Sequence, residues 1–165
     1  MTIEVREADL SNADHARGLL EVLDSYARGD MGGGAALEAG VRERLVPALR
    51  DNPAALVLLA LSDGRVVGVA TCFFGFSTFR ASSLLNVHDL AVLPEQQGRG
   101  IGAALLAAAE ERALARDCCK LTLEVREDNA RARRLYARRG FGDFELAGRR
   151  LPTLFLSKPL GSSGE

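Results

Sequence analysis

Apolar and polar residues alternate along parts of this chain, and elsewhere apolar residues recur with the spacing of a helix. Alternation is typical of strands buried on one face, and helical spacing is typical of amphipathic helices. Alternation and short apolar runs predict strands over residues 2–6, 55–61, 66–76, 84–93, 120–125, 141–146 and 152–156. Helical spacing predicts one helix that follows the capping residues Asp9, Ser11 and Asn12 and ends near Gly29, and others over residues 35–50, 98–116 and 129–138.

Turn residues separate these elements. Residues 62–65 join two apolar runs and predict an antiparallel hairpin. Pro47 should kink the second helix, and Gly140 should cap the end of the last one. The order β-α-α-β-β-β-α-β-α-β-β predicts a mixed sheet with helices on both faces. No linker or repeat divides the chain, so we expect one domain over residues 1–160 and a polar tail over residues 161–165.

The composition is that of a soluble globular protein. Of 165 residues, 47% are hydrophobic and 26% are charged, and the net charge is −1. This balance provides no basic patch for nucleic acid. The first residues lack the plan of a signal peptide, and every apolar run is shorter than the ~20 residues that span a bilayer. We therefore expect a cytoplasmic protein that binds neither nucleic acid nor membranes.

The cysteines follow neither a disulfide nor a zinc pattern. The chain has an odd number of cysteines, Cys72, Cys118 and Cys119, and no Cys-x-x-Cys spacing occurs. We interpret them as small buried side chains in a reducing compartment and expect no metal.

A glycine-rich turn at residues 97–103 carries the strongest chemical signal. It lies between a predicted strand and a predicted helix, so its backbone N–H groups and the positive end of the helix dipole point to one place. Because glycines lack a Cβ, phosphate oxygens can approach these amides, and a pyrophosphate fits such a site. The triplet Gly32–Gly34 is also rich in glycine. No strand leads into it and no Gly-Lys-Ser/Thr follows, so we interpret it as a flexible loop.

The turn also matches the fingerprint of dinucleotide-binding folds. Gly98, Gly100 and Ala103 have its spacing, and Glu124 ends the next strand, where a ribose-binding acid would stand. However, residues 94–97 separate the strand from the first glycine, and only one βαβ unit surrounds the turn. Too little chain follows it for the rest of such a fold. These features argue against a dinucleotide site.

Two segments resemble the signatures of the GNAT superfamily of N-acyltransferases. Residues 90–102 are similar to its acyl-CoA-binding segment, with the core Arg/Gln-x-x-Gly-x-Gly/Ala, which Gln97, Gly100 and Gly102 fill. Residues 129–141 are similar to its second signature, in which a capping Asn precedes Leu-Tyr-x-x-x-Gly-Phe. The two signatures lie in the family's order, with a helix and a strand between them.

This resemblance implies an α/β (α+β) fold with a central mixed, mostly antiparallel sheet, helices on both faces, and a strand that splays from its neighbour at the coenzyme A site. The backbone of the splayed strand would pair with the pantetheine arm of acetyl-CoA, and the glycine turn would bind its pyrophosphate. The residues that the resemblance places at the cosubstrate are Leu90, Ala91, Val92, Gln97, Gly98, Arg99, Gly100, Ile101, Gly102, Ala103, Asn129, Ala132 and Tyr136.

The resemblance further implies acetyl transfer to a primary amine, such as a polyamine or an amino acid. Tyr136 matches the family's tyrosine that protonates the coenzyme A sulfur, and a phenol with a pKa near ~10 can donate at neutral pH. His88 and Asp89 stand where the diamine and thialysine acetyltransferase branch has an acidic pair, from which His-Asp departs. One of the two would act as base or amine anchor. Adjacent strand residues face opposite sides, so only one would point into the cleft unless a bulge intervenes.

The acceptor amine itself is not specified by the sequence. The residues expected to line its pocket are Phe76, Phe79, Arg80, Asn86, His88 and Asp89. The arginines of residues 131–139 are typical of a solvated helix face, from which Arg138 could reach the 3′-phosphate of coenzyme A. Proteins of this family usually form homodimers, so the resemblance also implies a homodimer. Two other functions stay open, a non-catalytic acyl-CoA-binding or sensory domain and an acetyltransferase of peptide or protein N-termini.

Overall fold

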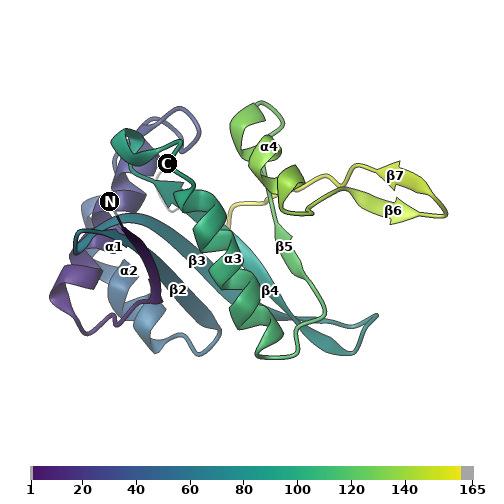
Figure 1. The fold of residues 1–165 in the computed structure, drawn as a ribbon, viewed down its shortest axis with the longest axis horizontal. Helices are drawn as coiled ribbons and strands as arrows, with labels where there is room; N and C mark the ends of the chain where they lie inside the picture. Colours follow the sequence, from purple (N-terminus) through teal and green to yellow (C-terminus); the bar gives the residue numbers. More distant parts are fainter. Residues whose placement is uncertain (1, 161–165) are drawn as a thin grey trace.

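A five-stranded sheet lies at the centre of the computed structural model, which describes residues 2–160 (Figure 1). In spatial order its strands are β1 (Ile3–Glu7), β2 (Ala55–Ser62), β3 (Arg65–Ser77), β4 (Ser82–Val92) and β5 (Leu121–Leu123). The helices are α1 (Ala13–Arg28), α2 (Ala39–Asp51), α3 (Ile101–Leu114) and α4 (Ala130–Arg138), with a short 3-10 helix, η1 (Pro94–Gln96), between β4 and α3. A separate hairpin contains β6 (Phe144–Leu146) and β7 (Arg149–Leu151).

The sheet is mixed and mostly antiparallel, as the sequence predicts. Neighbours from β1 to β4 are antiparallel, and β5 joins β4 in parallel. This topology contradicts the dinucleotide alternative, because such a fold is built on a mostly parallel sheet.

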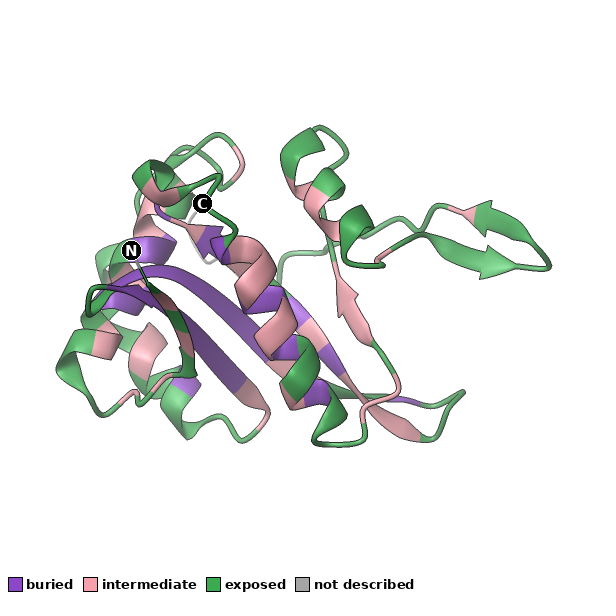
Figure 2. Ribbon diagram, in the orientation of Figure 1, coloured by how far each residue is buried: buried purple, intermediate pink, exposed green. Residues whose placement is uncertain are grey.

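The hydrophobic core lies along β2 and β3, at the middle of the sheet. Leu58, Leu59 and Val69 are fully buried, and Figure 2 shows both strands as an almost continuous buried band. A run of apolar residues without polar alternation fits strands that are covered on both sides. The core therefore forms between two layers of helices with the sheet between them.

A bulge in β3 helps to place α1 and α3 on opposite faces. Ala60 pairs with Gly68 and Leu61 with Val66, so one residue of β3 has no partner and the side-chain alternation shifts there. A Cβ on Gly18 of α1 would lie 2.5 Å from the Val66 side chain, whereas a Cβ on Gly68 would lie 2.9 Å from Ile101 of α3. Both glycines thus permit a helix to approach the sheet closely, each from its own side.

The C-terminal strands differ from the predicted pair. The prediction of a strand at residues 152–156 is wrong, because the partner of β6 is β7, at Arg149–Leu151. Ala147 and Gly148 have φ angles of 50° and 75°, the conformation of the tight two-residue turns that join hairpins. Pro152 then follows and has no N–H to continue the ladder.

The second helix begins later than predicted. It starts at Ala39 rather than at residue 35, because the backbone N–H of Leu37 donates to the Asp24 carboxylate (2.9 Å) and holds the preceding segment against α1. The other predicted strands and helices are present with boundaries shifted by a few residues. The predicted polar tail lies outside the described residues. Within residues 2–160, no helix has both the length and the apolar character needed to cross a bilayer.

Candidate active site

β4 and β5 part from each other halfway along β4. They pair only where Leu85–Val87 meets Leu121–Leu123, yet β4 runs on to Val92 with β3 on its other side. Among the described residues, the edge of β4 beyond Val87 has no strand partner on the β5 side. The backbone N–H of Leu93 donates to Val67 of β3, so the polar groups of Leu90 and Val92 point the other way, toward this open edge.

A bulge at His88 marks the point where the two strands separate. Val87 pairs with Cys72 and Asp89 pairs with Thr71, so His88 is the extra residue. Residues paired across two strands point to the same face of the sheet. Thr71 and Cys72 are adjacent and point to opposite faces, so their partners Asp89 and Val87 also point to opposite faces. The bulge that the sequence left as a possibility is present.

The bulge brings the polar residues of β4 to the face that α1 covers. Asp89 is half-buried, and its carboxylate accepts a hydrogen bond from the buried Thr71 hydroxyl. His88 is exposed, and its ring lies edge-on to Phe73 at 5.6 Å between centroids. Asn86 donates from Nδ2 to Thr122 Oγ1 (3.0 Å) across the β4–β5 pairing. The two residues predicted as base or anchor are therefore both next to the open edge.

The glycine turn lies where β4 ends and α3 begins. Gly98 and Gly100 have φ angles of 81° and 80°, which favour glycine, and Gly100 caps the start of α3. A Cβ on either would meet no protein atom within 4 Å, so open space lies in front of the helix N-terminus. Gln97 joins the turn to the strand edge, because its Nε2 donates to the Val92 carbonyl (3.0 Å). This geometry fits a phosphate group, and a side chain at either glycine would compete for that space.

Helix α4 packs against the first turn of α3. A Cβ on Gly102 would lie 3.1 Å from Leu135 of α4 and 3.9 Å from Leu90 of β4, so three elements meet there. Asn129 caps α4, because its side chain accepts from the Ala132 N–H at 3.1 Å. Asn129 and Ala132 are thereby placed at the N-terminal end of α4.

Tyr136 is half-buried on α4, with its ring inclined at 60° to Phe141 and 5.9 Å away between centroids. Burial raises the pKa of its phenol above the usual 10, and the nearby Tyr26 of α1 raises this pKa further. The phenol is therefore protonated at neutral pH, the form that can donate a proton.

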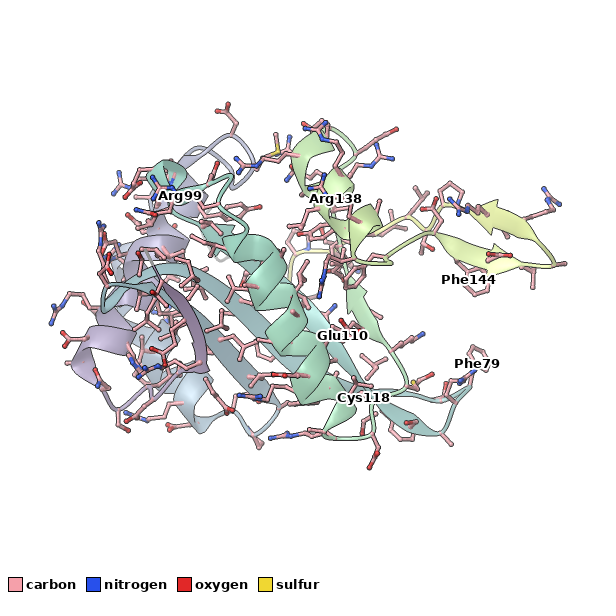
Figure 3. All side chains as sticks on the ribbon, viewed as in Figure 1. Phe79, Arg99, Glu110, Cys118, Arg138 and Phe144 are labelled. Carbon is pink, nitrogen blue, oxygen red and sulfur yellow. The ribbon has the colours of Figure 1, made fainter. Side chains whose placement is uncertain are left out.

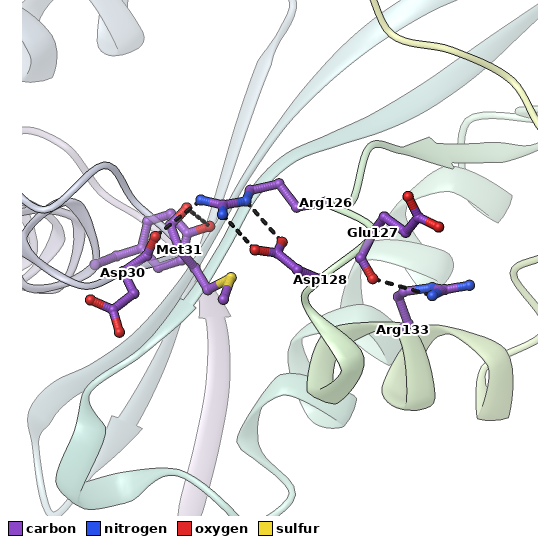
Figure 4. Close-up of polar contacts among 7 residues, drawn as sticks. Asp30, Met31, Arg126, Glu127, Asp128 and Arg133 are labelled. Atoms are coloured by element: carbon purple, nitrogen blue, oxygen red, sulfur yellow. Dashed lines mark hydrogen bonds and ion pairs between the residues drawn. The ribbon is translucent and has the colours of Figure 1, made fainter.

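The loop between α1 and α2 is fastened to the loop between β5 and α4 (Figure 4). Arg126 donates from Nη1 to the backbone carbonyl of Asp30 (3.0 Å) and forms two hydrogen bonds with the Asp128 carboxylate (3.0 and 2.6 Å). Tyr26 donates from its hydroxyl to the carbonyl of Met31 at 3.4 Å. The α1–α2 loop is thus fixed to the segment that leads into α4, the helix that carries Tyr136.

The predicted flexible glycine loop is folded back on α1. The N–H of Gly34 donates to the carbonyls of Ala27 (3.0 Å) and Gly29 (3.1 Å). A Cβ on Gly32 would lie 2.1 Å from the carbonyl oxygen of Tyr26, so only glycine fits there. This triplet shapes the loop next to Tyr26.

The structure does not bring all predicted pocket residues together. Phe76, Phe79 and Arg80 lie at the tip of the β3–β4 hairpin, with Phe79 fully exposed and directed away from the body of the protein (Figure 3). The eleven residues of β4, at about 3.3 Å each, separate this tip from the glycine turn. Their role at the acceptor stays a prediction.

Among the described residues, the cysteines and the potential metal ligands do not form a further candidate site. Burial raises the pKa of the Cys72 thiol to about 12, with the Asp89 carboxylate as a smaller cause, so this thiol stays protonated. Cys118 and Cys119 are free and half-buried. Within residues 2–160, no group of three or more His, Cys, Asp or Glu side chains is placed to hold a metal ion.

Three residues near the site were not identified from the sequence. They are Tyr26, which donates to Met31 in the α1–α2 loop, Arg126, which joins this loop to the β5–α4 loop, and Arg131, which donates from Nη1 to the Gln97 side chain in the glycine turn. The sequence contains a local signal only for Arg131, which lies one helical turn before Leu135 and on the same face of the predicted helix. The other contacts depend on how distant elements pack.

Comparisons with known proteins agree with this geometry. The family model described as "Acetyltransferase (GNAT) family" matches residues 19–141. An uncharacterised N-acetyltransferase from Archaeoglobus fulgidus is 44% identical over 82 residues, which cover 49% of this chain and 56% of that protein. YhfO, an uncharacterised N-acetyltransferase from Bacillus subtilis, is 29% identical over 99 residues, covering 60% and 66%. The aligned parts therefore span less than two thirds of both relatives.

The fold is also similar to those of solved structures. The ribosomal-protein-alanine N-acetyltransferase from Brucella melitensis biovar Abortus 2308 superposes with a TM-score of 0.69 at 21% identity, covering 91% of this chain and 100% of that one.

Proposed function

Because the chain belongs to the GNAT family of acetyltransferases, we propose that it transfers an acetyl group from acetyl-CoA directly to the primary amine of a small molecule. The observation that supports this proposal most is the joining of an unpaired strand edge to a glycine turn. Leu90 and Val92 offer backbone hydrogen bonds at the edge, and Gly98 and Gly100 leave space for phosphate at its end. Together they match the two parts of coenzyme A, an amide-containing arm and a pyrophosphate.

The chain's own groups provide the proton transfers that aminolysis of a thioester needs. A primary amine is mostly protonated at neutral pH and must lose a proton before it attacks the thioester carbonyl. Asp89 or His88, beside the open edge of β4, accepts that proton. As the C–S bond breaks, the Tyr136 phenol donates its proton to the departing sulfur. The raised pKa of Tyr136 supports this role, because the hydroxyl is protonated at neutral pH.

The acceptor class follows from the same groups. A carboxylate held by Thr71 next to an imidazole suits a polyamine- or amino-acid-like amine, although the diamine and thialysine acetyltransferase branch has an acidic pair at this position. Arg126 ties the α1–α2 loop to the segment that leads into α4, the helix of Tyr136, and a restrained loop there favours a small acceptor over a folded protein.

A thiol-release assay tests the proposal. Purified protein is incubated with acetyl-CoA and, separately, with polyamines, amino acids, aminoglycosides and short peptides. Thiol release above the no-acceptor rate with a small amine is the expected result. Release with peptides alone would indicate an N-terminal acetyltransferase. Binding of acetyl-CoA with no release for any acceptor would indicate a sensory domain.

We also propose a cytoplasmic homodimer. Phe144 and Leu146 on the β6–β7 hairpin are 60% and 58% exposed, and the hairpin projects from the central sheet in Figure 1, so a second copy could cover them. Analytical ultracentrifugation tests this, with a single monomeric species at micromolar concentration as the contrary result.

A further inference from the structure

Arg131 is linked to the open strand edge through the glycine turn. Its Nη1 donates to Oε1 of Gln97, and Nε2 of the same Gln97 donates to the Val92 carbonyl at 3.0 Å. The side-chain amide of Gln97 therefore connects three elements: the end of β4, the glycine turn and the first turn of α4. Arg131 and Gln97 are 34 residues apart in sequence, so this contact depends on the tertiary fold.

Helix packing directs Arg131 to this place. Leu135, one turn after Arg131 and on the same face of α4, packs against Gly102 in the first turn of α3. The same face of α4 therefore points toward the N-terminal end of α3. Asn129 fixes the start of α4 by its hydrogen bond to the Ala132 N–H, so Arg131 belongs to an ordered helical turn rather than to a loop.

The charge of Arg131 is available for an anion. Within residues 2–160 Arg131 takes part in no ion pair, and the group that accepts its hydrogen bond is the neutral amide of Gln97. By contrast, Arg126 pairs with Asp128, and Arg139 pairs with Glu110 of α3 at 3.6 Å. An unneutralised guanidinium next to the N-terminus of α3 adds to the positive dipole end and to the amides of the turn. The glycines leave open space there.

We propose that Arg131 binds the pyrophosphate of acetyl-CoA, a role that rests on the proposed function. On binding, the guanidinium exchanges the Gln97 oxygen for phosphate oxygens, which gives a charge-assisted hydrogen bond in place of a neutral one. Gln97 keeps its bond to Val92 and holds the strand edge ready for the pantetheine arm. Arg131 thus makes the protein prefer a thioester that carries phosphate over one that ends at pantetheine.

Isothermal titration calorimetry, which needs no acceptor, tests this assignment. Coenzyme A, dephospho-coenzyme A and pantetheine are titrated into wild-type protein and the variants Arg131→Ala and Arg131→Lys. Arg134→Ala is the matched control, because it removes an equal charge from another exposed position on α4. Melting midpoints of all variants show whether they fold.

We expect Arg131→Ala to weaken binding of coenzyme A and of dephospho-coenzyme A equally, by about tenfold, a typical loss for one charged contact. Pantetheine binding should not change, Arg131→Lys should restore most of the affinity, and Arg134→Ala should resemble wild type. An equal loss with pantetheine would mean that Arg131 acts through the strand edge and would overturn the assignment. A loss confined to coenzyme A would assign Arg131 to the 3′-phosphate instead. Wild-type affinity in Arg131→Ala refutes this inference alone, whereas no coenzyme A binding by wild-type protein refutes the proposed function as well.

Discussion

The guanidinium of Arg126 donates a hydrogen bond to the backbone carbonyl of Asp30 at 3.0 Å, across 96 positions of sequence. This contact fastens the α1–α2 loop to the loop that leads into α4, and the Asp128 carboxylate holds Arg126 in place. Tyr26, near the end of α1, lies close enough to Tyr136 to raise the pKa of its phenol.

Removal of the hydrogen bond between Arg126 and the Asp30 carbonyl should make the α1–α2 loop more mobile. In Arg126→Gln, the amides of residues 29–34 should exchange hydrogen several-fold faster, because the bond to the Asp30 carbonyl is lost. The KM for the acceptor should rise, whereas the Kd for coenzyme A should stay near the wild-type value. Asp30→Ala is the control, because the acceptor in this bond is the backbone carbonyl and survives the substitution. Equal exchange rates in Arg126→Gln and wild type would show that the bond does not restrain the loop.

Gly100 should be essential for coenzyme A binding. Gly100→Val places a β-branched side chain at a φ of 80°, and its Cβ points into the open space that a phosphate would need. Gly64→Val is a matched control, because Gly64 in the β2–β3 turn has a φ of 81° and equally open surroundings. Both variants should lose ~1–2 kcal/mol of folding stability from backbone strain. Only Gly100→Val should weaken coenzyme A binding, by about tenfold or more, and normal binding by calorimetry would reject the assignment of the turn.

Local signals in the sequence predict much of the fold. Asn12 was one of the predicted caps, and its side chain accepts from the N–H groups of Asp14 (2.8 Å) and His15 (3.2 Å). Such a cap depends on residues within one turn, so the sequence contains all that is needed to predict it. The glycine turn is similarly local, because its φ angles and the following helix are properties of adjacent residues.

Features that depend on the pairing of distant elements could not be predicted. The bulge at His88 arises from the register between β3 and β4, which no alternation within β4 reveals. The contacts of Arg126 and Arg131 depend on where the β5–α4 segment packs. The sequence therefore does not distinguish these two arginines from other surface arginines. The position of Phe79 was predictable in principle, because a residue between two strands of a hairpin lies at its tip.

Asp24 should make stability depend on pH at acidic values. Its carboxylate pairs with Arg28 (2.8 Å) and Arg42 (3.1 Å) and accepts the Leu37 N–H, which joins α1 to α2. The hydrogen bond from Arg28 is the largest cause that lowers its pKa below 3.8. Because the folded state holds the ionised form, this stabilisation is present above 3.8 and is lost as the pH falls through the lowered pKa.

Melting curves of Asp24→Asn should therefore lie below those of wild type at pH 7 and converge with them in strong acid. Asp51→Asn is the control, because Asp51 has only an exposed pair with Arg50 at the end of α2. Melting midpoints of Asp24→Asn and Asp51→Asn that fall equally at pH 7 would argue against the proposed role of Asp24.

His88 and Asp89 should shape the pH profile of kcat/KM, which reports the groups that titrate in the free enzyme. Asp89→Asn should lower kcat/KM by ~10²-fold or more if this carboxylate removes the amine proton. Thr71→Val, which removes the hydrogen bond to Asp89 and keeps the carboxylate, should have a smaller effect. His88→Gln identifies the contribution of the imidazole. A double variant of His88 and Asp89 with wild-type rate and profile would mean that water or the substrate carries the proton.

Tyr136 should act in the transition state and contribute little to binding of the ground state. If its phenol protonates the departing sulfur, Tyr136→Phe should lower kcat by ~10²–10⁴-fold, with the lower end favoured because a thiol is a fair leaving group. The KM for acetyl-CoA should change little. A purely structural tyrosine predicts the reverse, since loss of one hydroxyl costs at most ~1–2 kcal/mol of stability and leaves turnover unchanged.

The pH dependence provides an independent check on Tyr136. Burial raises the pKa of its phenol above 10, so the protonated form still predominates at pH 10, and most of the proton donor is lost only at higher pH. For wild-type protein, ionisation of Tyr136 should therefore lower kcat less than twofold between pH 7 and 10. Phe141→Leu, which keeps the hydroxyl but removes the neighbouring ring, is the matched control for packing. If Phe141→Leu reduces kcat as much as Tyr136→Phe does while both melt alike, the loss comes from displacement of α4, and the phenol is not the acid.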